Sequence, residues 1–150
     1  MLLKTHLMFA VLLIIIMLPY ANNKIVFLGL VLIGTIIPDL DSSCSKFGKR
    51  LIFRPFQFFV KHRGIMHTFT FVLILFFILN RYYSFIAFPL LLGYSLHLIT
   101  DSFTKQGIIV LWPLKFRIRG LLTTGGAFEN LLFNLLVFLN IFLFLVWFVI

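Results

Sequence analysis

The sequence predicts an all-α fold, a polytopic membrane helical bundle of about five apolar helices with two long cytoplasmic connections. Two observations indicate this class. The chain of 150 residues is 62% hydrophobic and only 11% charged, and its mean hydropathy of +1.14 is too high for an ordinary soluble fold. Its apolar runs are also long enough to cross a bilayer, where only helices and closed barrels satisfy the backbone. We therefore expect one integral membrane domain over residues 1–150.

Each apolar segment is expected to be one helix of the bundle. Polar turns at 22–24 and 80–82 separate neighbouring segments. The first segment starts with a basic residue, but its apolar run is long and no good cleavage site follows, so we expect a retained helix rather than a signal peptide. The second segment is short, because a helix over Ile25–Ile37 is about 20 Å long whereas the hydrocarbon core of a bilayer is about 30 Å thick. This helix is therefore expected either to tilt or to be re-entrant, entering and leaving the membrane on one side. The segments are Leu2–Tyr20, Ile25–Pro38, Ile65–Leu79, Tyr83–Thr100 and Phe128–Ile150.

Positive charge is concentrated on one side of the predicted bundle. If all five segments cross, every basic residue except Lys24 and Arg81 lies with the N-terminus and the long connections Asp41–Gly64 and Asp101–Ala127. The positive-inside rule then places that side in the cytoplasm, with the chain in the inner membrane. Topology and attraction to anionic lipid headgroups account for the net charge of +9, so we expect no nucleic-acid partner.

The second connection is predicted to lie on the membrane surface. Lys115–Arg119 alternates basic and apolar residues with period two, which is typical of an extended segment with one face on lipid or protein. Trp112 suits an anchor at the membrane interface. Cys44 is the single cysteine, which excludes an internal disulfide, and it is expected to be a free thiol in the first connection.

Histidines and carboxylates gather near the ends of the apolar segments, where unsatisfied polar groups are costly beside lipid. Pro38–Asp41 ends the second segment, His62–His67 spans the start of the third, and Gly93–Asp101 ends the fourth. His6 lies at the start of the first segment and Glu129 in the first turn of the last. The predicted topology places all of these groups at one membrane face, so they can share a site.

A bound metal ion would satisfy these groups. His97 and Asp101 are four residues apart on a helix, so they present a nitrogen and an oxygen from one face. Gly64 permits a sharp turn that lets His62 and His67 converge. Mixed nitrogen and oxygen ligands favour zinc, with manganese or another divalent ion as the alternative. Each residue alone is also compatible with a helix cap, a turn or an interfacial side chain. The candidate ligands are His6, Asp39, His62, His67, His97 and Asp101.

Three further residues are candidates for catalysis. Asp41 and Glu129 are placed to act as a base or to orient a ligating histidine. Arg63 lies between two histidines and is the best candidate for contact with an anionic substrate. Arg117 and Arg119 come next, although each basic residue also serves as a topology signal.

The order of these motifs resembles a known family. Thr104, Gly107, Pro113 and Thr124-Gly125 continue the pattern, which covers nearly the whole chain from His6. The set resembles the YdjM-like, LexA-regulated membrane-bound metal-dependent hydrolases. That family is similar in ligand order to the zinc-dependent phospholipase C and single-strand nuclease superfamily, in which a helical bundle holds a cluster of zinc ions. The motifs are Pro38-Asp39-Leu40-Asp41, His62-Arg63-Gly64 with His67-Thr68, Gly93-Tyr94 with His97 and Asp101, and Glu129.

The resemblance implies metal-binding roles for His97 and Asp101. It implies the same role, by position, for Asp39 and His67, and after them for His6 and His62. It also implies hydrolysis, and the cationic rim favours a phosphoester or a lipid headgroup as the substrate. The alternative is a metal-binding membrane protein without catalysis, acting in transport or as a scaffold. A transporter is expected to place its ligands near mid-membrane, whereas these lie at segment ends. The sequence leaves the oligomeric state open.

Overall fold

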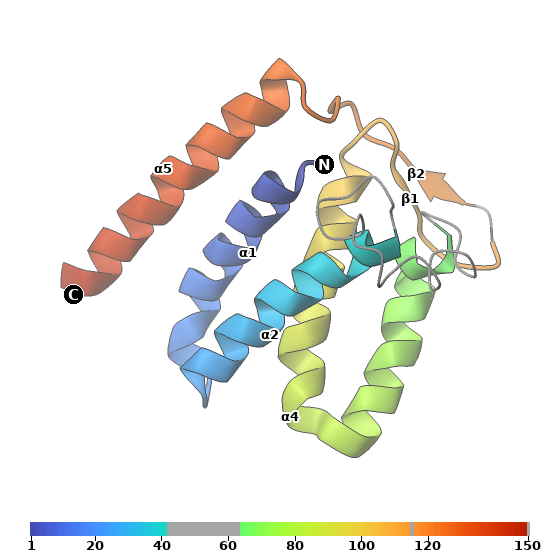
Figure 1. Ribbon diagram of the computed structural model, residues 1–150, viewed down its shortest axis with the longest axis horizontal. Helices are drawn as coiled ribbons and strands as arrows, with labels where there is room; N and C mark the ends of the chain where they lie inside the picture. Colours follow the sequence, from blue (N-terminus) through green and yellow to red (C-terminus); the bar gives the residue numbers. More distant parts are fainter. Residues whose placement is uncertain (42–63, 115, 150) are drawn as a thin grey trace.

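The structure is a computed structural model that describes residues 1–41, 64–114 and 116–149, apart from the side chains of residues 41 and 148. Most of this part is helical, as predicted, and the helices lie side by side in a bundle (Figure 1). A two-stranded antiparallel sheet and an isolated β-bridge between Thr104 and Leu122 depart from the all-α prediction within these ranges. The elements are α1 (Leu3–Met17), η1 (Leu18–Tyr20), α2 (Lys24–Ile36), η2 (Ile37–Asp41), η4 (Ile65–His67), α4 (Phe69–Ser102), β1 (Ile108–Ile109), β2 (Arg117–Ile118) and α5 (Ala127–Val149).

Local capping explains where two of the helices begin. The side chain of Asn23 accepts a hydrogen bond from the backbone N–H of Val26 at 3.2 Å and opens α2. Thr68 does the same for Phe71 at 3.2 Å and opens α4. The α1 helix has no side-chain cap from its own N-cap residue, so its first N–H groups depend on another element.

The prediction of about five separate apolar helices is not confirmed, since the described residues form four α-helices. Most of the third apolar segment and all of the fourth belong to α4, and the third begins in η4. Its backbone leaves helical geometry at Tyr83 (φ −145°, ψ 59°), where α4 bends back on itself (Figure 1). The predicted turn at 80–82 is thus a bend without a loop. Val72 of the first arm packs against Leu91 and Tyr94 of the second.

The closest crossing in the bundle joins α2 to the second arm of α4. A Cβ atom on Gly34 would overlap the backbone carbonyl of Leu90, and one on Gly93 would overlap that of Val31. Small residues at such a crossing let two backbones approach each other. This approach brings the carboxyl end of α2 beside the helical turn that carries His97.

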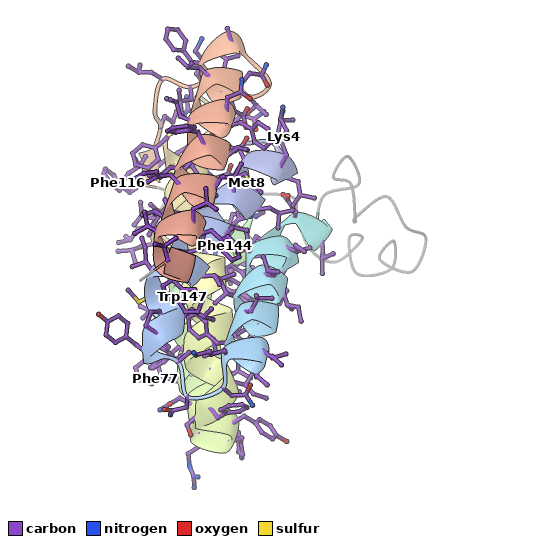
Figure 2. The ribbon with its side chains drawn as sticks, turned by 90° about the vertical axis from the view of Figure 1, so that its left-hand side faces the viewer. Lys4, Met8, Phe77, Phe116, Phe144 and Trp147 are labelled. Carbon is purple, nitrogen blue, oxygen red and sulfur yellow. The ribbon has the colours of Figure 1, made fainter. Side chains whose placement is uncertain are left out.

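Large apolar side chains cover the outside of the helices. Figure 2 shows Phe77, Phe144 and Trp147 pointing outward, and they are 69%, 55% and 47% exposed. Among the described residues, three helical stretches are long and apolar enough to cross a membrane. Such a surface would sit in a lipid bilayer, where apolar side chains are stable. The stretches are Leu3–Tyr20, Phe69–Ser102 and Ala127–Trp147.

Candidate metal centre

The ends of α1, η2, η4 and α4 meet at one end of the bundle and bring together five of the predicted metal ligands. They form two overlapping sets that share one histidine, and within each set the ligand atoms lie within 4.8 Å of one another. A re-entrant second segment would have separated His6 from the others; instead, His6 belongs to the first set. The sets are His6, His97 and Asp101, and Asp39, His67 and His97.

His97 is held by its δ nitrogen. The Nδ1 atom lies 2.8 Å from the backbone carbonyl oxygen of Thr35, and because a carbonyl only accepts, Nδ1 carries the hydrogen. In the neutral ring the lone pair is therefore on Nε2. This atom is buried and has no hydrogen-bond partner among the described residues. It lies 3.8 Å from Asp39 Oδ1 and 3.9 Å from Asp101 Oδ2.

His6 is held in the same way and stacks on His97, with ring centroids 3.9 Å apart and planes 7° from parallel. Its Nδ1 lies 2.7 Å from the hydroxyl of Thr100. That hydroxyl donates its single hydrogen to the carbonyl of Leu96 or His97, at 3.0 and 2.9 Å, so it accepts from His6. The lone pair of neutral His6 is again on Nε2, which lies 3.4 Å from Asp101 Oδ1 and lacks a hydrogen bond in the described part.

Two bare imidazole nitrogens thus face carboxylate oxygens, an arrangement that is repulsive unless a cation lies between them. The separations of 3.4 to 3.9 Å are longer than good N–H···O hydrogen bonds. The shortest, 3.4 Å, equals the separation of two ligand atoms that each lie about 2.1 Å from a tetrahedral ion, and the others are 3.8 and 3.9 Å. Each histidine donates its other N–H, the usual way in which proteins orient a ligating imidazole. The residues therefore fit a divalent metal ion.

Asp101 carries negative charge at the centre of the first set. Its Oδ1 also lies 2.6 Å from the amino nitrogen of Met1. The contact shows that this carboxylate attracts a cationic group. The side chain is only 2% exposed, so its charge has little access to water.

His67 and Asp39 complete the second set. The ring of His67 meets His97 edge to face, with centroids 5.8 Å apart, and η4 is held by a hydrogen bond of 2.8 Å from the Tyr94 hydroxyl to the carbonyl of Met66. Asp39 is the most exposed ligand, at 20%. Burial raises the pKa of Asp39 above its ordinary value, although the nearby histidines His6 and His67 lower it in part. A bound cation would stabilise the ionised form.

Glu129 lies in neither ligand set and accepts hydrogen bonds from two backbone N–H groups and one hydroxyl instead. Its Oε1 accepts hydrogen bonds from the N–H of Leu2 at 2.6 Å and from the Thr5 hydroxyl at 2.9 Å. Its Oε2 accepts from the N–H of Gly125 at 2.6 Å. One buried carboxylate therefore caps the N-terminus of α1 and the entry to α5, where negative charge is favourable.

Sequence reasoning missed the groups that orient the histidines. Thr35 supplies only a carbonyl, which any residue carries, so no sequence signal identifies it. Thr100 and Tyr94 are polar residues within the motif that ends α4, and their position beside His97 was a usable signal. The remaining predicted site residues, Asp41, His62 and Arg63, lie outside the described residues or have no described side chain. Cys44 also lies outside the described residues. Arg117 lies in β2 and Arg119 follows this strand, and both side chains are exposed.

Comparisons with known proteins agree with the membrane character of the chain. The family model for the YdjM inner membrane protein matches residues 1–150. The uncharacterized protein YvsG of Bacillus subtilis is 34% identical over 91 residues, covering 58% of this chain and 57% of that protein. The inner membrane protein YdjM of Escherichia coli is 33% identical over 96 residues, covering 56% of this chain and 47% of that protein.

The chain spans about half the length of the curated relatives it matches. No solved structure matches it. The family match covers every residue, and the apolar helices suit an inner membrane protein. The chain therefore belongs to the family of the YdjM inner membrane protein.

Proposed function

We propose that this chain is a membrane-embedded metal-dependent hydrolase whose site faces the cytoplasm. One observation carries the proposal: His6 and His97 each donate Nδ1–H, and both buried Nε2 atoms face carboxylate oxygens. Neither a solvated histidine nor a helix cap requires that pairing. A divalent cation does, and zinc is the first candidate for a mixture of imidazole and carboxylate donors.

A divalent ion bound there would supply a water of lowered pKa and a Lewis acid for a phosphoryl or carbonyl oxygen. The chain supplies the ligands and their orientation: Thr35 and Thr100 fix the tautomers of the two stacked histidines. Arg63 stays our candidate for contact with an anionic substrate. Asp41 stays a candidate base. Of the two roles predicted for Glu129, a base or a positioning residue, its three hydrogen bonds favour the positioning role.

The proposed substrate is a phosphoester, and a lipid headgroup is its simplest source. The ligands lie where α4 ends and α1 begins, which is the level of headgroups if those helices cross a bilayer. The concentration of basic residues on the same side supports both an anionic substrate and a cytoplasmic location.

Metal analysis of detergent-purified protein tests this proposal. We expect bound zinc in the wild type and a loss of most of it in His97→Ala and His6→Ala. Asn140→Ala is the matched control, because Asn140 is also buried and polar. Its amide donates to the Met8 carbonyl, on the side of α1 that faces away from the metal ligands. Hydrolysis of phosphodiester and phospholipid substrates should follow metal content across the variants. Equal metal content in all four proteins would end the proposal.

A metal-binding protein without catalysis is the second candidate, and the burial of the ligands favours it. His6, His67, His97 and Asp101 are each at most 2% exposed, and a structural metal site is closed whereas a catalytic one keeps an open position. A chelator distinguishes the two. Stripping the ion should abolish hydrolysis if the site is catalytic, and should lower only thermal stability if it is structural.

A further inference from the structure

Hydrogen bonds hold the β1–β2 hairpin at the end of the bundle where the proposed metal ligands lie. The backbone N–H of Phe69 donates to the carbonyl of Val110 at 2.9 Å, and that of Trp112 donates to the Thr70 hydroxyl at 2.9 Å. At the other end of α4, the N–H of Gly120 donates to the carbonyl of Thr104 at 3.0 Å. The hairpin is therefore fixed to both ends of α4. If α4 spans lipid, the hairpin lies at the membrane interface.

The two faces of the hairpin differ in polarity. Ile108 pairs with Ile118, so their side chains share a face, and Ile108 is buried in the cluster that includes Val72 and Leu98 of the helices. Ile118 and Phe116 lie on this face but beyond the helices, 44% and 66% exposed. Figure 2 shows Phe116 on the flank of the bundle. They extend the apolar helix surface outward, as lipid-facing residues do.

The opposite face and the adjoining turn complete an amphipathic surface. Arg117 pairs with Ile109 on the opposite face, and Arg119 follows two residues later on that same face. In the turn, Leu111, Trp112 and Leu114 are 43%, 53% and 63% exposed. The sequence holds no aspartate or glutamate from residue 102 to 128. The arginines therefore have no carboxylate partner within their own connection.

We propose that this hairpin is an interfacial anchor that binds anionic lipid headgroups. Its apolar face and turn lie at the boundary between headgroups and acyl chains, and Arg117 and Arg119 contact lipid phosphates. Amphipathic segments with cationic faces bind membrane surfaces in this manner, more strongly when the lipid is anionic. Because the hairpin is bonded to both ends of α4, it sets the depth of that helix in the bilayer. The proposal does not require a metal ion or catalysis.

The depth of Trp112 tests the anchor. Trp112 and Trp147 are the two tryptophans, so Trp147→Phe leaves Trp112 as the reporter. The protein is reconstituted into phosphatidylcholine vesicles with increasing phosphatidylglycerol. Phospholipids brominated near the carbonyl end of the acyl chain should quench Trp112 strongly. Aqueous iodide should quench it weakly, and less as the anionic fraction rises.

Charge variants test the choice of lipid. In the Trp147→Phe background, we measure the phosphatidylglycerol fraction that gives half of the maximal decrease in iodide quenching of Trp112. Arg117→Gln and Arg119→Gln should each raise this fraction by roughly fivefold. Lys24→Gln and Arg81→Gln, each made singly, are the charge-matched controls, because these basic residues lie at the opposite end of the bundle, and they should leave the response unchanged. All four residues are exposed, so folding should persist.

Two results would overturn the proposal. Strong quenching of Trp112 by iodide, without quenching by brominated lipid, would put the hairpin in water. A phosphatidylglycerol response that is unchanged in the Arg117 and Arg119 variants, or equally reduced in the controls, would show that these arginines do not select the lipid. Metal content is measured on each sample, since its loss would bear on the proposed hydrolase and not on the anchor.

Discussion

Glu129→Gln is the substitution that best separates positioning from catalysis at the proposed centre. The glutamine keeps one carbonyl oxygen for Leu2 and Thr5, but turns an amide group toward the N–H of Gly125. Hydrogen bonds to a charged group contribute about 1.5–3 kcal/mol each, against about 0.5–1.5 for neutral ones. Neutralising the two bonds to Leu2 and Thr5 costs roughly 2.5 kcal/mol at mid-range values, and losing the bond to Gly125 costs about 2 kcal/mol more. The first of these losses falls on the start of α1, whose first turn carries His6.

Part of this loss should reach the metal through His6. The packing of α1 on α2 still holds the helix, so we expect metal affinity to fall about tenfold, the low end for residues that orient a ligand. Because Glu129→Gln lowers metal affinity through His6, the substitution should have no effect on affinity when His6 is absent. The double variant His6→Ala/Glu129→Gln should bind metal as tightly as His6→Ala alone.

A competition titration with a fluorescent chelator, in detergent, measures all four affinities of this cycle. Asn130→Ala is the control: Asn130 is the next residue on α5, and it accepts an exposed hydrogen bond of 3.0 Å from Lys4. It should leave affinity within twofold, as exposed contacts contribute little. Additive losses in the double variant would refute the reasoning. So would unchanged affinity in Glu129→Gln with hydrolysis lost, because Glu129 would then act as a base.

Three further substitutions test the supports of the site. Thr100→Val removes the acceptor for His6 Nδ1–H and should weaken metal binding about 10- to 100-fold in the chelator titration, whereas Thr100→Ser should restore it. Gly93→Ala places a Cβ atom on the backbone of α2 and should cost roughly 2 kcal/mol or more in thermal melting, while Gly29→Ala, with nothing within 4 Å, should not destabilise. Tyr94→Phe removes one buried hydrogen bond and should lower the free energy of unfolding by about 1 kcal/mol in a denaturant titration.

The candidate site was more predictable than the fold. Spacing placed His97 and Asp101 on one helical face, and polar groups at segment ends indicated that Asp39, His67 and His6 would meet them; the structure brings these five together. Such groups stand out in an apolar chain because each requires a partner near lipid. The number of separate helices was not predictable, because the 80–82 segment has turn-forming residues and yet bends without a loop at Tyr83.

The orientation of His97 could not be predicted because it depends on a contact remote in sequence. The carbonyl of Thr35 reaches His97 only because two glycines let α2 and α4 cross closely. Glycines in membrane helices are common, so their presence alone does not identify a crossing. Likewise, Glu129 in a first helical turn predicts its own helix cap, but not that it would also cap α1.

The two proposals concern the same end of the molecule and constrain each other. The hairpin is bonded to Thr104, three residues beyond Asp101, and to Phe69, two residues beyond His67. An anchor at headgroup level therefore puts the proposed ligands at the boundary between headgroups and hydrocarbon, close to the phosphoesters of the surrounding lipid. If brominated lipids instead placed Trp112 at the bilayer centre, a headgroup substrate would lose its geometric basis even if the metal were bound. Metal content and hairpin depth are thus separate measurements, and only the two together support a lipid phosphoester as the substrate.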